Sequence, residues 1–234
     1  KGLYFYDGIT LKRARIIGSK HPFAIVWSLF VDREGLVWFF TEGHGLYSYN
    51  KNTEICDEYR PEPGDPNSLT SNSACCLSNN ITQDKEGLIW VGTDKGLNSF
   101  NKETGKFTQY KHNQNDSNSL SNNSIWTVFV SKNGLIWIGT DDGLNCYDKK
   151  TNKFMCYKNQ PGNLDSLSNN QVYAIVEDKE GKLWLGTKNT GIDKFDPKTN
   201  RFTNYRHNHS NPSSISCNEI HHMMLDQFNH LWVC

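Results

Sequence analysis

The chain repeats, with small changes, the stretch Asp178-Lys179-Glu180-Gly181-Lys182-Leu183-Trp184-Leu185-Gly186-Thr187. Related copies begin at Asp32, Asp84 and Ser131, and a more divergent fifth copy begins at Asp226. The tryptophans of the five copies stand at positions 38, 90, 137, 184 and 232, so the period is 47 to 52 residues. A nearly constant period of this length indicates a repeat protein.

One repeat, residues 123–157, contains four short segments with the composition of β-strands. The first, 123–130, is rich in β-branched and aromatic residues, the second is 135–140, the third is a short strand at 144–148, and the fourth, 154–157, is apolar at its ends; tight turns that contain Gly or Asn separate them. The second segment is almost wholly apolar, so we expect both of its faces to be covered. No stretch shows the periodicity and caps of a helix.

Four short antiparallel strands in about 47 residues match the size of one β-propeller blade. We therefore predict an all-β fold, a β-propeller of four-stranded antiparallel blades with about five repeats, and expect the repeated Trp to fill the gap between neighbouring blades. A single propeller segment would span residues 1–234. It would comprise a half-blade at 1–18, blades at about 23–60, 73–110, 123–157 and 170–206, and a half-blade at 215–234.

The two half-blades are complementary, because the first resembles the later strands of a blade and the last resembles the earlier ones. Two readings stay open: a closed five-bladed ring, or an arc of a larger propeller. The chain stops at Cys234, before the Gly-Thr pair of the earlier copies, and we therefore expect a segment of a longer protein.

The connectors between blades repeat as well. Each carries Ser-Leu or Ser-Ile, followed three residues later by Asn72, Asn123, Asn170 or Asn218. We expect the apolar residue to be buried and the small polar residues to bond to backbone and fix the crossing between blades.

Composition excludes several classes of partner. Twenty-five basic and 25 acidic residues give a net charge of zero, so no global field attracts nucleic acid or an anionic membrane. No apolar run approaches the roughly 20 residues of a membrane helix. The seven cysteines share no repeat position and show no metal-binding spacing, although a pair such as Cys146 with Cys156 stays open.

The repeat as a whole resembles a known family. Asn118-Ser119-Leu120-Ser121-Asn122-Asn123, the stretch from Asp84 to Thr93 and the following Asp94-Lys95-Gly96-Leu97-Asn98 resemble the two-component regulator propeller repeat. Such repeats typify the periplasmic sensor half of hybrid two-component systems in gut Bacteroidetes. The resemblance covers essentially the whole chain. It implies a non-enzymatic ligand-sensing ectodomain segment for a carbohydrate breakdown product, which signals to a histidine kinase and is homodimeric in its full-length form. Its partners would be an oligosaccharide or other small molecule and the remainder of the sensor, without nucleic acid or membrane contact in this segment. The fifth copy has Asn229 where Gly is expected, so its turn is expected to differ.

Signs of catalysis are few. The carboxylates fall mostly at turn positions, and no nucleophile elbow, zinc-binding HExxH or P-loop occurs. We expect no catalytic residue, no metal and no cofactor. Two alternatives remain: a metal-dependent enzyme that resembles streptogramin lyase and uses His221, which has no evident carboxylate neighbour, and a scaffold that binds proteins. A metal site formed by His221, His222 and His230 is also conceivable.

The candidate ligand site lies near the start of each blade's first strand, which lines the central channel of a propeller. Aligning the copies on the turn Asp or Ser places Trp27, Trp126, Tyr173 and His221 equivalently, with Cys75 or Cys76 as the nearest counterpart in the irregular second blade. Sugars are often bound by aromatic faces with polar rims, so we predict that these rings contact the ligand, against the alternative that they pack between blades.

Overall fold

The computed structural model describes residues 3–18, 25–41, 43–75 and 79–234. These residues form twenty β-strands, and no helix occurs among them. No helical segment of the described chain therefore has the length and apolar character needed to cross a membrane.

Four sheets contain four antiparallel strands each, and we call them blades 1 to 4. Blade 1 consists of β3 (Val26–Val31), β4 (Val37–Thr41), β5 (Gly45–Tyr49) and β6 (Cys56–Tyr59). Blade 2 consists of β7 (Ile81–Gln83), β8 (Ile89–Thr93), β9 (Gly96–Asn101) and β10 (Lys106–Tyr110). Blade 3 consists of β11 (Ile125–Val130), β12 (Ile136–Thr140), β13 (Gly143–Asp148) and β14 (Lys153–Tyr157). Blade 4 consists of β15 (Val172–Glu177), β16 (Leu183–Thr187), β17 (Gly191–Asp196) and β18 (Arg201–Tyr205).

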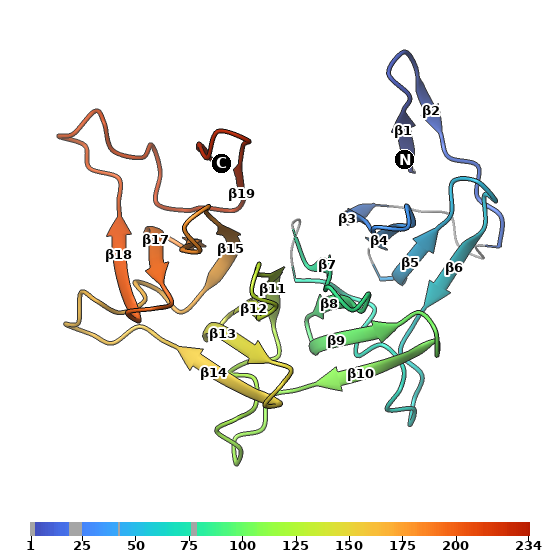
Figure 1. Ribbon diagram of the computed structural model, residues 1–234, viewed down its shortest axis with the longest axis horizontal. Helices are drawn as coiled ribbons and strands as arrows, with labels where there is room; N and C mark the ends of the chain where they lie inside the picture. The colour runs from blue at the N-terminus through green and yellow to red at the C-terminus, as the bar shows by residue number, and fades with distance from the viewer. Residues whose placement is uncertain (1–2, 19–24, 42, 76–78) are drawn as a thin grey trace.

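Two hairpins flank the blades: β1 (Tyr4–Tyr6) with β2 (Leu11–Arg13), and β19 (Met223–Leu225) with β20 (Leu231–Val233). Figure 1 shows the blades arranged as an arc, with the first strand of each blade innermost and the last outermost. The two hairpins lie on opposite sides of the opening of the arc and form separate sheets. The all-β propeller architecture is confirmed, and the described strands form an arc without a ladder that joins its ends.

The turn between the first two strands of a blade is built by the repeated Asp. In blade 2, Asp84 Oδ1 accepts the backbone N–H groups of Glu86 and Leu88, and Oδ2 accepts the indole N–H of Trp90 at 2.8 Å. Gly87 completes the turn with a φ of 93°, a conformation that L side chains rarely adopt. In the fifth copy Asn229 takes the same place with a φ of 70°, and its N–H bonds to Asp226 as the N–H of Gly87 bonds to Asp84. The expectation that this turn differs is therefore wrong, because Asn tolerates the left-handed region.

The core lies between blades. All five residues of β8 and of β12 are buried, as predicted for a strand covered on both faces. Trp90 packs with Ile136 and Ile138 of the next blade, which confirms that the repeated Trp fills the gap between blades. Three repeat-equivalent glycines make room for the neighbouring first strand, since a Cβ on Gly139 would lie 2.4 Å from the carbonyl oxygen of Val172.

Blade 1 has Phe40 at this glycine position, and Phe40 is completely buried against Ile81 and its neighbours. The first strand of blade 2 is correspondingly short, with three residues from Ile81 to Gln83. A bulky residue in the place of Gly thus accompanies the irregularity of the second blade.

Three connectors are pinned as predicted, because Leu69, Leu120 and Leu167 are at most 1% exposed, whereas Ile215 of the fourth connector is only half-buried. In blades 2, 3 and 4 a side chain two residues after the last strand also closes the connector. His112 Nδ1 lies 2.6 Å from the carbonyl oxygen of Leu120, His207 Nδ1 lies 2.7 Å from that of Ile215, and Asn159 donates its amide to Leu167. Because a carbonyl oxygen can only accept, Nδ1 of both histidines donates to the backbone.

Candidate functional site

The predicted ligand-site residues share one local geometry. The pairing register shifts at Trp27, Trp126 and Tyr173, each of which is the extra residue of a β-bulge in the first strand of its blade. In the C-terminal hairpin the N–H groups of His221 and His222 both bond to the carbonyl of Cys234, which gives His221 the same place. A bulge re-aims the side chain of the extra residue, and the strands that carry these bulges in blades 1, 3 and 4 are the innermost strands of the arc (Figure 1).

Three of the four rings form a continuous row across neighbouring blades. The ring centroids of Trp126 and Tyr173 are 4.5 Å apart, and those of Tyr173 and His221 are 5.6 Å apart with nearly parallel planes. Tyr173 is buried, Trp126 is half-buried and His221 is exposed. Trp27 lies at the equivalent register of β3, with blade 2 between it and Trp126. The row shows that packing between blades is part of the role of these rings, while their contact with a ligand stays a prediction.

The counterpart in the second blade is Asn79. Ile81 pairs with Val91 in blade 2 as Val128 pairs with Ile138 in blade 3, so Ile81 and Val128 are equivalent. Counting back two residues from each shows that Asn79 is the equivalent of Trp126. The expectation of Cys75 or Cys76 is wrong, because the five-residue interval before Asp84 is kept. Cys76 lies outside the described residues.

Polar side chains from the neighbouring turns surround the row. Asp141 Oδ1 accepts the indole N–H of Trp126 at 2.8 Å and the amide of Gln171 at 2.8 Å. Glu219 Oε1 lies 3.5 Å from Nε2 of His221, so His221 has a carboxylate neighbour that the sequence did not reveal. The rim thus offers both hydrogen-bond donors and acceptors beside aromatic faces, which is the combination that binds sugars.

The electrostatics of the rim are mixed. Burial raises the pKa of the Tyr173 hydroxyl, Lys188 lowers that pKa by its charge and hydrogen bonding, and Asp141 and Glu219 raise it again. The net effect is a raised pKa, so the hydroxyl stays protonated at neutral pH. Gln171, Lys188 and Glu219 were missed by sequence reasoning. A usable signal existed for Lys188, because it follows the repeated Gly-Thr as Asp94 and Asp141 do.

The histidines proposed for a metal site do not converge. His230 Nδ1 bonds to Asp226 Oδ2 at 2.9 Å in the turn beyond β19, whereas His221 and His222 precede that strand. Within the described residues, no group of three or more His, Cys, Asp or Glu side chains is placed to hold a metal ion.

Cys146 and Cys156 are not placed to form a disulfide. Cys146 pairs with Met155 and Cys156 pairs with Asn145, so the two cysteines occupy neighbouring rather than opposite positions of β13 and β14. Both are free, with Cys146 buried and Cys156 exposed.

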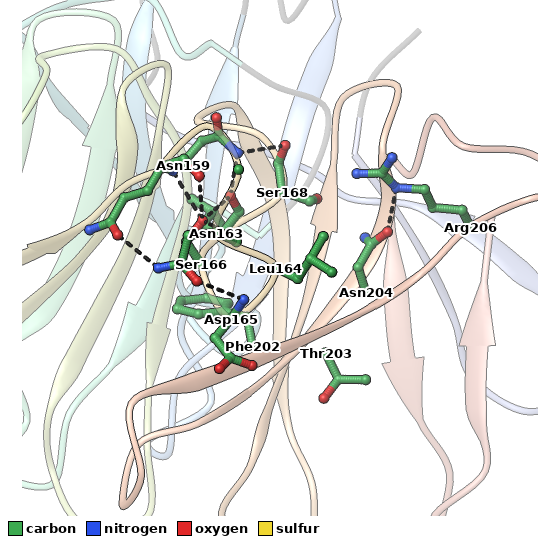
Figure 2. Close-up of a pocket in the computed structure, with 13 residues that line it drawn as sticks. Asn159, Asn163, Leu164, Asp165, Ser166, Ser168, Phe202, Thr203, Asn204 and Arg206 are labelled. Carbon is green, nitrogen blue, oxygen red and sulfur yellow. Dashed lines mark hydrogen bonds between the residues drawn. The ribbon is translucent and has the colours of Figure 1, made fainter.

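A hollow lies on the outer side of the arc between blades 3 and 4 (Figure 2). It has a volume of about 540 Å³ and is formed by the connector at 159–168 and by β18 with Arg206. The close-up shows amide, hydroxyl and carboxylate groups in it, with Asn204 accepting from Arg206 Nε. An equivalent hollow of about 540 Å³ lies at the connector 61–70, next to Gln109 and Lys111. Its repetition identifies it as a product of the blade architecture.

Two stretches of the chain match a known family of repeats. Residues 119–142 and 166–189 match the family model described as two component regulator propeller. The resemblance seen in the sequence is thereby confirmed, and the chain carries repeats of this family. None of the curated proteins matches the chain significantly.

Solved structures with the same fold include sensor domains and an enzyme. The extracellular domain of the hybrid two component system BT3049 from B. thetaiotaomicron is 25% identical, with a TM-score of 0.54, and the match covers 99% of this chain and 36% of that one. The extracellular domain of BT4673 from the same organism is 18% identical, with a TM-score of 0.57 and coverage of 100% and 34%. An inactive variant of virginiamycin B lyase from Staphylococcus aureus, solved with quinupristin, is 16% identical, with a TM-score of 0.65 and coverage of 97% and 67%. This chain spans about a third of the length of the two sensor domains.

Proposed function

We propose that this chain is part of the ligand-sensing ectodomain of a hybrid two-component sensor. It binds a carbohydrate breakdown product without turnover, in the periplasm, and passes the signal to a histidine kinase in the remainder of a homodimeric protein. The observation that carries the proposal is the row of Trp126, Tyr173 and His221 with its polar rim. The matching repeats and the similarity to extracellular sensor domains support the context.

The row suits a readout of binding because it crosses blades. A ligand that contacts rings from two or three blades has an affinity that depends on how those blades are placed relative to one another. Binding then shifts the balance between two arrangements by the difference in affinity for them.

A thermal-shift screen against neutral, amino and acidic oligosaccharides, with and without divalent metals, tests the proposal. A ligand that binds only the folded state raises the melting temperature by mass action. We expect one glycan to raise it without metal, and Trp126→Ala to weaken that glycan at least tenfold. Arg206→Ala, in the outer hollow of Figure 2, is the control and should leave affinity unchanged. If Arg206→Ala loses binding and Trp126→Ala does not, the ligand binds in the outer hollow instead of at the inner row.

A second candidate is a metal-dependent lyase. The observations that favour it are the Glu219 carboxylate beside His221 and the shared fold with virginiamycin B lyase. A thermal shift that requires metal, together with turnover that His221→Ala abolishes, would replace the sensor by the enzyme. Binding in the presence of a chelator, with the glycan recovered unchanged, excludes this second candidate.

A further inference from the structure

Within the part of the chain that the structure describes, one aromatic position of the inner row is missing, and a carboxylate is left without its donor there. In blade 3, Trp126 donates its indole N–H to Asp141, the residue that follows the Gly-Thr pair of the same blade. The equivalent residues of blade 2 are Asn79 and Asp94. Asn79 is exposed and carries no ring, and Asp94 Oδ1 is buried without a hydrogen-bond partner.

The unpaired oxygen is unusual on physical grounds. Buried polar atoms are nearly always hydrogen-bonded, and an unpaired one destabilises the fold. Two further unpaired atoms, Ser28 Oγ and Asn80 Oδ1, lie one residue beyond the bulge position in blades 1 and 2. Thr127, the equivalent residue of blade 3, has a partner, because it donates to the carbonyl of Asn79. Two of these unsatisfied acceptors, Asn80 Oδ1 and Asp94 Oδ1, thus belong to blade 2, the blade that lacks the ring.

Ring spacing in the row indicates what would fit. The centroids of neighbouring rings are 4.5 and 5.6 Å apart, so one blade step corresponds to the separation of two aromatic rings in contact. By register, Trp27 and Trp126 flank Asn79 on either side. The position at blade 2 is therefore the place of one ring between two indoles.

We infer that the ring of a bound sugar takes the missing aromatic position at Asn79 and donates a hydroxyl or ammonium hydrogen bond to Asp94. This inference rests on the proposed function and narrows its ligand class. Asp94 and Asp141 are both carboxylates, so the ring at this position is a neutral or amino sugar. A uronic acid there would face like charges.

Asn79→Trp tests the inference in two independent ways. The indole supplies Asp94 with the donor that Trp126 gives Asp141, so we expect the melting temperature without ligand to rise by about 2–4 °C. The same indole occupies the sugar position, so affinity for the glycan that binds wild type should fall at least tenfold. Unchanged affinity would overturn the inference and leave the proposed sensor function standing.

Asp94→Asn is the second variant, in case the larger side chain prevents folding. It removes the charge that attracts the donor, so the neutral glycan should bind about tenfold more weakly while the fold keeps its stability. A uronic acid analogue of the same glycan should gain affinity relative to wild type. Equal binding of the neutral glycan and of its uronic acid analogue by both proteins would contradict the assignment. If no glycan binds wild type, the proposed function fails, and the melting temperature of Asn79→Trp alone decides whether Asp94 lacks a donor.

Discussion

The ammonium nitrogen of Lys149 lies 2.5 Å from Oδ2 of Asp84 and links blade 3 to the turn of blade 2. The same arrangement joins blades 1 and 2, where Lys102 lies 3.0 Å from Asp32. Each Asp already caps its own turn and accepts a Trp indole, so one carboxylate organises a turn, a core ring and an interface between blades.

Removing the ammonium should destabilise the fold. Lys149→Met leaves the carboxylate of Asp84, which is 1% exposed, without its counter-charge. We expect a loss of about 2 kcal/mol in the free energy of unfolding, measured in urea, because loss of one partner of a buried pair leaves a desolvated charge. Lys150→Met changes the exposed neighbouring residue and should stay within about 0.5 kcal/mol of wild type. Equal effects of the two variants would show that the pair contributes nothing.

The link is absent between blades 3 and 4, and the sequence shows why. Ser131 stands in the place of the capping Asp, and Pro197 stands in the place of the Lys. The double variant Ser131→Asp with Pro197→Lys should create the missing pair. We expect a coupling energy of about 1–2 kcal/mol in a double-mutant cycle followed by urea unfolding. Pro197→Lys alone should bring no gain, since Ser131 offers no charge; additive single effects would contradict the interpretation.

Much of this architecture could be predicted from the repeat. The repeated Asp, Gly and Trp, with Ser131 and Asn229 as the exceptions, defined the turn and the buried second strand, because these contacts are local in the chain. The interval of five residues before the turn located the bulge positions, and three of the predicted rings do meet. The lysine links and the rim residues could not be found in this way, since Lys149 and Asp84, or Glu219 and His221, meet through blade packing or local loop geometry. Asn79 was overlooked because the residues around it differ from those of the other copies, although its distance of five residues from Asp84 is the same as in the other blades.

Pro61 explains one unpaired buried atom. Asn123, Asn170 and Asn218 accept the backbone N–H of His112, Asn159 and His207 with their side-chain oxygens. The equivalent oxygen of Asn72 has no partner, because the residue in the donor position is Pro61, which lacks an N–H.

Pro61→Asn should therefore stabilise the protein. The new N–H satisfies an acceptor whose unpaired burial costs about 1–3 kcal/mol, while losing the rigid Pro costs about 0.4–1 kcal/mol. We expect a net gain near 1 kcal/mol, measured as a shift of the urea midpoint. Pro63→Asn, two residues further along the same connector, should lack the gain. A loss of stability in Pro61→Asn would mean that Asn72 is satisfied in another way.

Asp193 gives the protein a distinctive pH dependence. It occupies the buried position of Asn98 and Asn145, and burial raises its pKa although the N–H of Ser168 and the amide of Asn204 lower it in part. The folded state therefore binds the proton more tightly than the unfolded state, whose carboxyl has a pKa of 3.8. This contribution to stability is fully present below pH 3.8 and is lost as the pH rises through the raised pKa of the folded state.

Asp193→Asn should remove that dependence. As the pH rises above 3.8, the unfolding free energy of the variant should increase relative to that of wild type. Urea unfolding at a series of pH values from 3.5 to 7 measures this difference. Asn145→Asp is the converse variant in blade 3 and should acquire the dependence, because Asn145 is completely buried at the same register. Parallel pH profiles for all three proteins would show that the carboxyl of Asp193 titrates as it does in the unfolded chain.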